Sequence, residues 1–237
     1  MRRTSFSSLL LRAVVVAACV ALSCGTGAAA DDISLAFYEG YGHYKVEGSF
    51  LVDADSKTAW EVLTNYEQIP NFVHSMKISK VEHRDTNDLV LLQEGEGGFL
   101  FFSKRIHLLM DVHEQPQTST IIFSDTSHQD FSVYQGTWRI TPSTLGHGLE
   151  VIYTLDADQN FSAPAFIASD VVKGNVQDLL QSLKREIALR QNQIDQELAA
   201  RALAASKALP SKLNLALKSG NAVDSLAIQV TPVISHP

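Results

Sequence analysis

One long amphipathic helix after a run of short strands limits the folds open to this chain more than any other feature. Apolar residues recur at three- or four-residue spacing through that helix, at Ala168, Val172, Val176, Leu179, Leu183 and Ile187. This spacing gives a helix one apolar face that must be covered. We expect the helix to begin near Pro164 and to continue by propensity to about Leu209, where Pro210 ends it.

About seven strand-like segments precede the helix and predict a meandering antiparallel sheet. A short helix over Ser56–Thr64, capped by Asp55, and a second helical turn separate the first segment from the other six. Glycine and proline residues at 95–98, 115–117 and 146–148 are the expected hairpin connections. The segments are Tyr44–Val52, Met76–Glu82, Leu89–Glu94, Phe99–His113, Thr118–Ser124, Phe131–Ile140 and Gly148–Ala157.

A strongly bent sheet can wrap the helix, and unfilled space between the two becomes a ligand cavity. Alternation along the longest strand predicts one inward face, which consists of Leu100, Phe102, Ile106, Leu108, Met110 and Val112. The helix carries small residues, Ala165 and Ala168, near its start and larger leucine and isoleucine residues later. The cavity is therefore expected near the start of the helix.

The candidate ligand-binding residues come from the inward faces of the strands and from the first turns of the helix. Core packing and cavity lining use the same face in such an architecture, so both interpretations fit these side chains. The candidates are Phe102, Ile106, Met110, Tyr134, Trp138, Tyr153, Phe166 and Val172.

The first thirty residues have the pattern of a secretory signal peptide. Arg2, Arg3 and Arg12 form a basic segment, an apolar run follows over 13–22, and Ala30 ends a small-x-small cleavage site. Export to the periplasm or beyond the cell is the expectation. Cys24 stands in a sequence that loosely resembles a lipoprotein box, so lipidation is an alternative that we rank below simple cleavage.

Cleavage after residue 30 would leave 207 residues with 16 basic and 26 acidic side chains and no cysteine. No cluster of lysine or arginine occurs in the body of the chain. This acidic balance argues against a nucleic-acid partner and against an anionic membrane surface, because both attract a basic face. The apolar run of the leader is too short to span a bilayer comfortably, so no integral span is expected in the mature chain.

Motifs for metal binding or nucleophilic catalysis are missing from the sequence. The eight histidines show no HxH or HxxxH spacing, the GxSxG motif does not occur, and both cysteines lie in the leader. We therefore predict no metal, no cofactor and no catalytic residue. General acid–base chemistry is harder to exclude, because Lys104, Glu94 and Asp170, with the hydroxyls of Tyr134 and Tyr153, could act in a cavity.

A longer pattern resembles the START-like (SRPBCC) superfamily, and more narrowly its polyketide cyclase/dehydrase and coenzyme Q-binding branch. The resemblance runs from Tyr44 to Arg190 and uses three segments. They are Val52-x-Ala54-x5-Trp60-x-Val62-Leu63-Thr64-Asn65-Tyr66-Glu67-x-Ile69-Pro70-x-Phe72, Asp130-Phe131-x2-Tyr134-x-Gly136-x-Trp138, and Pro164-x-Phe166 with the helix that follows. Many members have Asp where this chain has Asn65.

The resemblance implies an α+β helix-grip fold, a curved antiparallel sheet wrapped on the C-terminal helix. It also implies an apolar cavity for lipids, isoprenoid quinones, sterols or polyketides. We expect a signal peptide over 1–30, the ligand-binding domain over 31–191, a helical extension over 192–209 and a poorly ordered tail over 210–237.

Three functions follow as hypotheses. The preferred one is an exported module that binds or carries an apolar small molecule, without catalysis. The second is a cyclase or dehydratase that uses acid–base groups in the same cavity. The third is an interaction protein whose helix beyond Arg190 docks on a partner through Ile194, Leu198 and Leu203.

Overall fold

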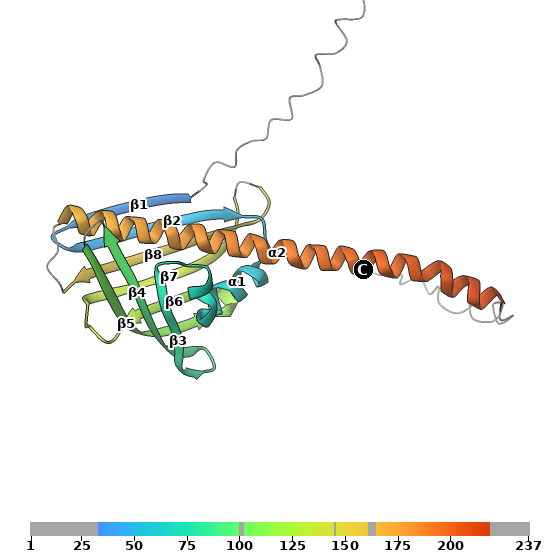
Figure 1. The fold of residues 1–237 in the computed structure, drawn as a ribbon, viewed down its shortest axis with the longest axis horizontal. Coiled ribbons are helices and arrows are strands. Elements are labelled where there is room, and N and C mark those ends of the chain that lie inside the picture. The colour runs from blue at the N-terminus through green and yellow to red at the C-terminus, as the bar shows by residue number, and fades with distance from the viewer. Residues whose placement is uncertain (1–32, 100–101, 145, 161–164, 219–237) are drawn as a thin grey trace, which may run out of the picture. The chain divides into compact units, whose positions relative to one another are not determined.

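Within residues 33–99, 102–144, 146–160 and 165–218, which this computed structural model describes, eight antiparallel strands form one sheet around one long helix (Figure 1). The expected helix-grip fold is confirmed. In chain order the elements are β1 (Ile33–Gly40), β2 (His43–Val52), α1 (Ser56–Thr64), η1 (Tyr66–Asn71), β3 (Met76–Asp85), β4 (Asp88–Phe99), β5 (Phe102–Gln115), η2 (Pro116–Thr118), β6 (Thr120–Asp125), β7 (Phe131–Pro142), β8 (Leu149–Gln159) and α2 (Ala165–Lys218).

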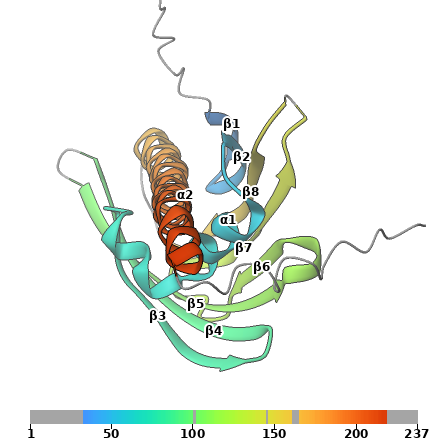
Figure 2. The ribbon, with the colours of Figure 1, turned by 90° about the vertical axis from the view of Figure 1, so that its right-hand side faces the viewer.

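The sheet has the order β1-β2-β8-β7-β6-β5-β4-β3, and it bends so far that it surrounds α2 on several sides. Figure 2 shows this wrapping along the helix axis. The pairing of β2 with β8 joins the start of the domain to its end, while β3 to β8 follow one another as a meander. One concave face therefore receives side chains from strands that are far apart in the sequence.

Helix α2 packs closely against this face at a glycine residue of β2. A Cβ atom on Gly48 of β2 would lie 2.6 Å from a methyl carbon of Leu180, so the absence of a side chain lets the helix approach the sheet. Leu180, Leu183 and Ile187 are fully or almost fully buried below it. A hydrogen bond also connects α2 to the start of α1. The backbone N–H of Asp55, the N-cap of α1, donates to Oε1 of Gln191 in α2 at 3.0 Å.

The predicted inward faces agree with the observed burial. On β5, Leu108, Met110 and Val112 are buried, and on β8 every second residue from Leu149 to Ala157 is buried. Asp55 caps α1 as expected, with Oδ1 accepting the N–H of Thr58 at 2.7 Å. The period-two pattern thus predicted which residues face the helix.

The predicted count of about seven strands was one too low, because β1 was missed. Residues Ile33, Leu35 and Phe37 alternate toward the core, and β1 pairs in register along β2. The two strands are joined by Tyr41 and Gly42, both with positive φ, which is the geometry of a type I′ turn. Tyrosine is an uncommon residue in that position, and the turn was therefore not recognised in the sequence.

Gly95, Gly97 and Gly98 were expected to form a hairpin turn, and this was wrong. They lie inside β4, paired to β5 from Asp88 to Phe99. Gly95 has a packing reason for lacking a side chain, since a Cβ there would lie 3.2 Å from the Ser75 carbonyl oxygen. That carbonyl accepts the N–H of Glu96 at 2.9 Å.

The expected end of the last helix at Pro210 was also wrong. Helix α2 continues through Pro210 to Lys218, in a stretch whose alanine, leucine and lysine residues favour helix on both sides of the proline. From residue 192 to 207 every residue of α2 is exposed, and Figure 1 shows this part projecting away from the sheet. The leader over 1–30 and residues 219–237 lie outside the described residues. Among the described helices, none is long and apolar enough to cross a membrane.

The close pairing of β7 and β8 yields a test of this packing. A Cβ on Gly136 would lie 2.0 Å from the carbonyl oxygen of Thr154 and 2.7 Å from the ring of Phe123. We expect Gly136→Ala to lower the free energy of unfolding by about 1–3 kcal/mol in urea denaturation.

The matched control is Gly174→Ala in α2, where nothing lies within 4 Å of the added carbon. Because alanine is the better helix former, this change should raise stability by about 0.5–1 kcal/mol. Equal effects of the two substitutions would show that the β7–β8 contact is looser than described.

Candidate functional site

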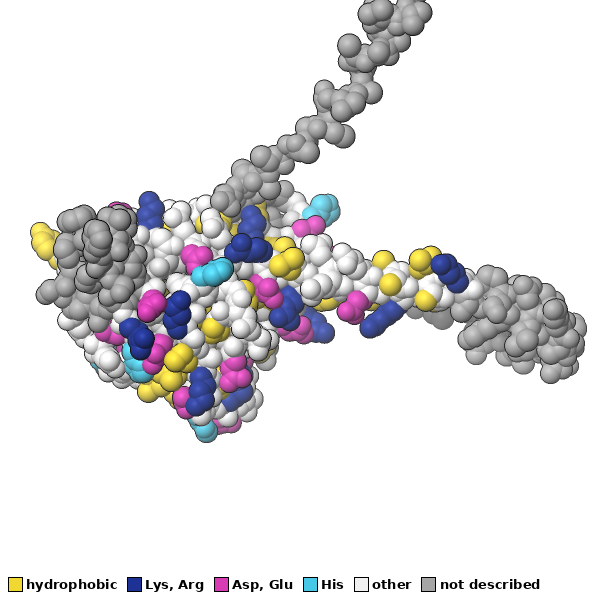
Figure 3. Space-filling view, in the orientation of Figure 1, with side chains coloured by type: hydrophobic (Ala, Val, Ile, Leu, Met, Phe, Trp, Pro, Cys, Tyr) yellow, Lys and Arg dark blue, Asp and Glu magenta, His cyan; other side chains and the backbone are white. Residues whose placement is uncertain are grey.

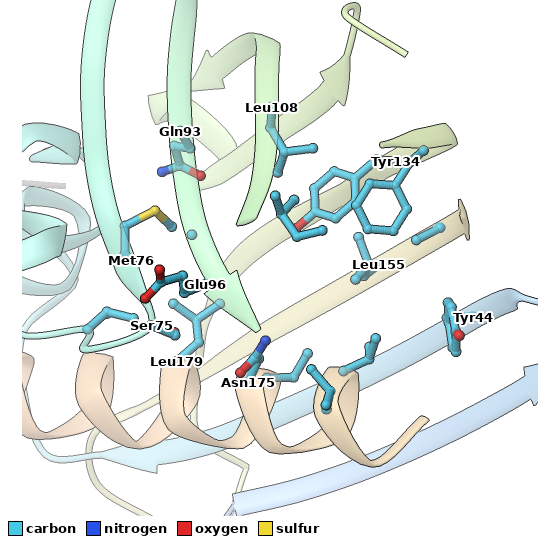
Figure 4. A pocket seen from close by; sticks show the side chains of 18 of the residues that line it. Tyr44, Ser75, Met76, Gln93, Glu96, Leu108, Tyr134, Leu155, Asn175 and Leu179 are labelled. Carbon is cyan, nitrogen blue, oxygen red and sulfur yellow. The ribbon is translucent and has the colours of Figure 1, made fainter. Parts of the chain in front are cut away.

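A cavity of about 180 Å³, which we call the main cavity, lies between the first turns of α2 and the concave face of the sheet (Figure 4). Its helix wall runs from Val171 to Leu179, as the small-to-large gradient along α2 predicted. Strands β2, β3, β4, β5, β7 and β8 supply the other walls. The apolar lining includes Val73, Met76, Ile106, Leu108, Phe131, Leu155, Ala157, Val171, Val172, Val176 and Leu179.

The polar groups of the lining are few and mostly paired within the protein. The hydroxyl of Tyr44 donates to Gln159 Oε1 at 2.9 Å. The side-chain amide of Gln93 donates to Ser79 Oγ at 3.1 Å. Glu96, the one carboxylate among the described lining residues, is exposed and lies 3.9 Å from Lys77 Nζ. The lining therefore presents an apolar surface with no uncompensated charge in its depth.

Tyr134 of β7 and Tyr153 of β8 both line the main cavity. Burial raises the pKa of both phenols above the ordinary 10.0, and the two side chains are near enough to influence each other's pKa. Trp138 packs on Tyr153 with ring centroids 4.3 Å apart. Both phenols are consequently neutral near pH 7, so they can exchange hydrogen bonds with a ligand without adding charge.

A second cavity of about 90 Å³ lies beside the main cavity, toward α1 and η1. The two share five lining residues, Met76, Gln93, Tyr134, Tyr153 and Leu179. A ligand in either cavity would therefore contact some of the same side chains.

Behind the second cavity lies a buried ionic network that the sequence interpretation missed. Glu114 is 6% exposed and accepts a hydrogen bond from the Tyr66 hydroxyl at 3.0 Å. Both terminal nitrogens of Arg84 contact its carboxylate at 3.1 Å. A signal was available, because Glu114 continues the inward period of β5 two residues after Val112, and a buried acid needs a partner. The network fixes Tyr66 in the cavity wall.

The predicted ligand-binding residues divide between the two cavities. Ile106, Tyr134, Tyr153 and Val172 line the main cavity, and Met110 and Trp138 line the second one together with the two tyrosines. The side chains of Phe102 and Phe166 lie outside the described residues. Whether these residues contact a ligand stays a prediction. The prediction selected apolar and aromatic side chains and so missed Gln93, Gln159 and Asn175. Gln93 and Gln159 continue the inward faces of β4 and β8, and Asn175 lies on α2.

Of the acid–base candidates whose side chains are described, Tyr134 and Tyr153 line the main cavity, whereas Glu94 and Asp170 do not. Glu94 contacts the imidazole of His107 at 3.3 Å and is not part of either lining, and Asp170 is exposed. The side chain of Lys104 is outside the described residues. Among the residues that the structure describes, no three His, Cys, Asp or Glu side chains are grouped as a metal site would need.

Comparison with known proteins places residues 52–184 in a family described as polyketide cyclase/dehydrase and lipid transport. Three similar solved structures illustrate the fold. The Zhui aromatase/cyclase from a Streptomyces species is 15% identical, with a TM-score of 0.55 over 62% of this chain and 95% of that one. A STAR-related lipid transfer protein from Xanthomonas axonopodis is 13% identical, with a TM-score of 0.52 over 66% and 99%.

The third structure, a protein from Thermus thermophilus, is 18% identical, with a TM-score of 0.52 over 60% of this chain and 96% of that one. Identities this low show the shared fold alone. No curated protein sequence matches the chain significantly.

The buried phenols give a pH test of this geometry. Since the folded pKa values of Tyr66, Tyr134 and Tyr153 lie above 10.0, the folded state keeps protons that the unfolded chain loses. Their contribution to stability is complete below pH 10 and is lost as pH rises through the folded values. We expect the free energy of unfolding to fall above pH 10 by about 1.4 kcal/mol per pH unit for each such tyrosine.

The double variant Tyr134→Phe/Tyr153→Phe should show a shallower alkaline slope in urea unfolding at several pH values. Tyr41→Phe is the control, because Tyr41 is fully exposed and its removal should leave the slope unchanged. An identical slope in all three proteins would show that the cavity phenols titrate as in water.

Proposed function

The chain belongs to the polyketide cyclase/dehydrase and lipid transport family, and on this premise we propose that it binds and carries one uncharged apolar small molecule in the main cavity. The observation that carries this proposal is the character of the lining. Its depth is apolar, its two phenols are neutral, and its one described carboxylate stands at an exposed position beside a lysine. Such a surface favours a ligand without charge.

The driving force for binding is the burial of apolar area, worth roughly 25 cal/mol per Å². The hydroxyls of Tyr134 and Tyr153 add a polar contact suited to a carbonyl or hydroxyl oxygen of the ligand. An isoprenoid quinone or another lipid with one oxygenated end combines both properties. We propose this class of ligand, and we propose that the chain meets it after export, as the pattern of the leader indicates.

Carrying fits this lining better than acid–base catalysis does. A general acid or base works best with a pKa near the operating pH, whereas burial moves the pKa of both cavity phenols further from neutrality. Glu94 and Asp170, the acids proposed for such chemistry, are not in the lining. The described lining therefore offers hydrogen-bond donors in its depth, and its one carboxylate, Glu96, lies at an exposed position.

One observation favours an enzyme as the second candidate. Two neutral phenols that line an apolar cavity can polarise a ketone oxygen, which is what an intramolecular aldol cyclisation needs from its protein. Incubation with a linear poly-β-ketone thioester would reveal an aromatic product by its absorbance. Product formed by the wild type and lost in Tyr134→Phe/Tyr153→Phe would support the enzyme over the carrier.

Filling the cavity tests the carrier proposal. Val172 lies on the helix wall of the main cavity, so Val172→Phe places an aromatic ring in the space that a ligand would occupy. We expect this variant to bind the uncharged fluorescent probe 1-N-phenylnaphthylamine at least about tenfold more weakly in a fluorescence titration, which corresponds to about 1.4 kcal/mol.

The control is Leu189→Phe, which adds a ring to an exposed position of the same helix outside both cavities. Its affinity for the probe should equal that of the wild type. Equal affinity of all three proteins would place the probe outside the cavity and would count against the proposal.

A further inference from the structure

The second half of α2 has no partner in the described structure. The hydrogen bond from Asp55 to Gln191 joins α2 to the body, and beyond it residues 192–207 are all exposed. Leu198 and Leu203 are each 56% exposed on this segment. An isolated helix is only marginally stable in water, so a surface that covered these leucines would stabilise it.

The charge of this part of the chain differs in sign from the charge of the rest. Residues 31–197 contain 12 Lys and Arg against 25 Asp and Glu, whereas residues 198–218 contain four basic residues and no acid. The four are Arg201, Lys207, Lys212 and Lys218. The net charge of the whole chain is negative, and yet this segment at its C-terminal side is basic.

The sequence also separates the leucines of 198–218 from its basic residues. A helical wheel at 3.6 residues per turn is expected to place Leu198, Leu203, Leu209, Leu213 and Leu217 on one side and the four basic residues on the other, with Leu215 as the exception. The described side chains of this set are those of Leu198, Arg201, Leu203 and Lys207. Within the described side chains, Arg201 is held by Glu197 at 3.5 Å, and both are largely exposed. Figure 3 shows apolar and basic side chains side by side along the projecting helix.

We propose that residues 198–218, the basic arm, lie on an anionic lipid surface. A helix of this composition matches the general design of an interfacial helix, with leucines in the acyl boundary and lysines at the phosphate headgroups. Its 21 residues extend about 30 Å along the surface. The acidic body is repelled by the same surface, so attachment through the arm holds the body away from the lipid.

The arm lies beyond the family match, which ends at residue 184, and the inference does not depend on what the cavity binds. It gives the chain a surface on which lipid exchange could occur. A negative result in the probe-binding experiment would not affect the proposal for the arm, and a negative result in the vesicle experiment would not affect the proposal for the cavity.

The test is sedimentation of residues 31–237, which contain every described helix and strand, with lipid vesicles. We expect binding to mixed phosphatidylcholine–phosphatidylglycerol vesicles, weaker binding to pure phosphatidylcholine, and a loss of binding as salt is added. The variant Arg201→Gln/Lys207→Gln/Lys212→Gln should bind about a hundredfold more weakly, at about fivefold per charge.

Matched controls distinguish an effect of the arm from an effect of the total charge or the total hydrophobicity of the chain. Lys45→Gln/Lys57→Gln/Lys80→Gln removes the same charge from exposed positions of the body and should leave binding unchanged. Leu198→Ala/Leu203→Ala should weaken binding at least about tenfold, while Leu189→Ala should not.

Two results would overturn the proposal. Equal weakening by the arm and body lysine variants would show that net charge, not the arm, governs attachment. A chain that ignores vesicles but is a dimer in solution, and that becomes monomeric in Leu198→Ala/Leu203→Ala, would show that a second copy covers the leucines instead.

Discussion

The contact between α2 and the floor of the bent sheet determines the rest of this structure. Gly48 provides the close approach, and Leu180, Leu183 and Ile187 fill the space around it. Because these large residues belong to the middle of the helix, they hold it firmly at one end of the concave face. Toward its start, where smaller side chains face the sheet, the same geometry leaves a cavity. The packed core and the cavity are therefore two parts of the same contact between α2 and the sheet.

The buried acids of this protein accept structural hydrogen bonds and do not line the main cavity. Asp125 accepts the backbone N–H groups of Leu109 and His128, and Asp130 accepts that of His107 at 2.8 Å. These carboxylates accept hydrogen bonds from backbone N–H groups of β5 in the part of that strand that extends beyond the end of β6. Glu114 is likewise committed to Arg84. Buried acids are costly unless they are paired in this way. None of these three carboxylates lines the main or the second cavity, and Glu114 also holds Tyr66 in the wall of the second one.

The sequence predicted the fold and the position of the cavity because both follow from periodicity. Alternation on β5 identified Ile106 and Met110 as inward, and the three-to-four spacing identified the helix face that contains Val172. Periodicity does not predict turns that contain uncommon residues. The turn at Tyr41 was therefore not recognised, and β1, which it joins to β2, was missed. It also cannot distinguish lining from core, since Val151 and Tyr153 share the inward face of β8 but only Tyr153 lines the main and second cavities.

Native mass spectrometry of the purified chain, followed by organic extraction of the same sample, tests the central claim most directly. The account predicts one uncharged apolar molecule per polypeptide, released into the organic phase and identifiable by its mass. A mass equal to that of the bare polypeptide, unchanged after incubation with a total lipid extract, would contradict a carrier function for this cavity.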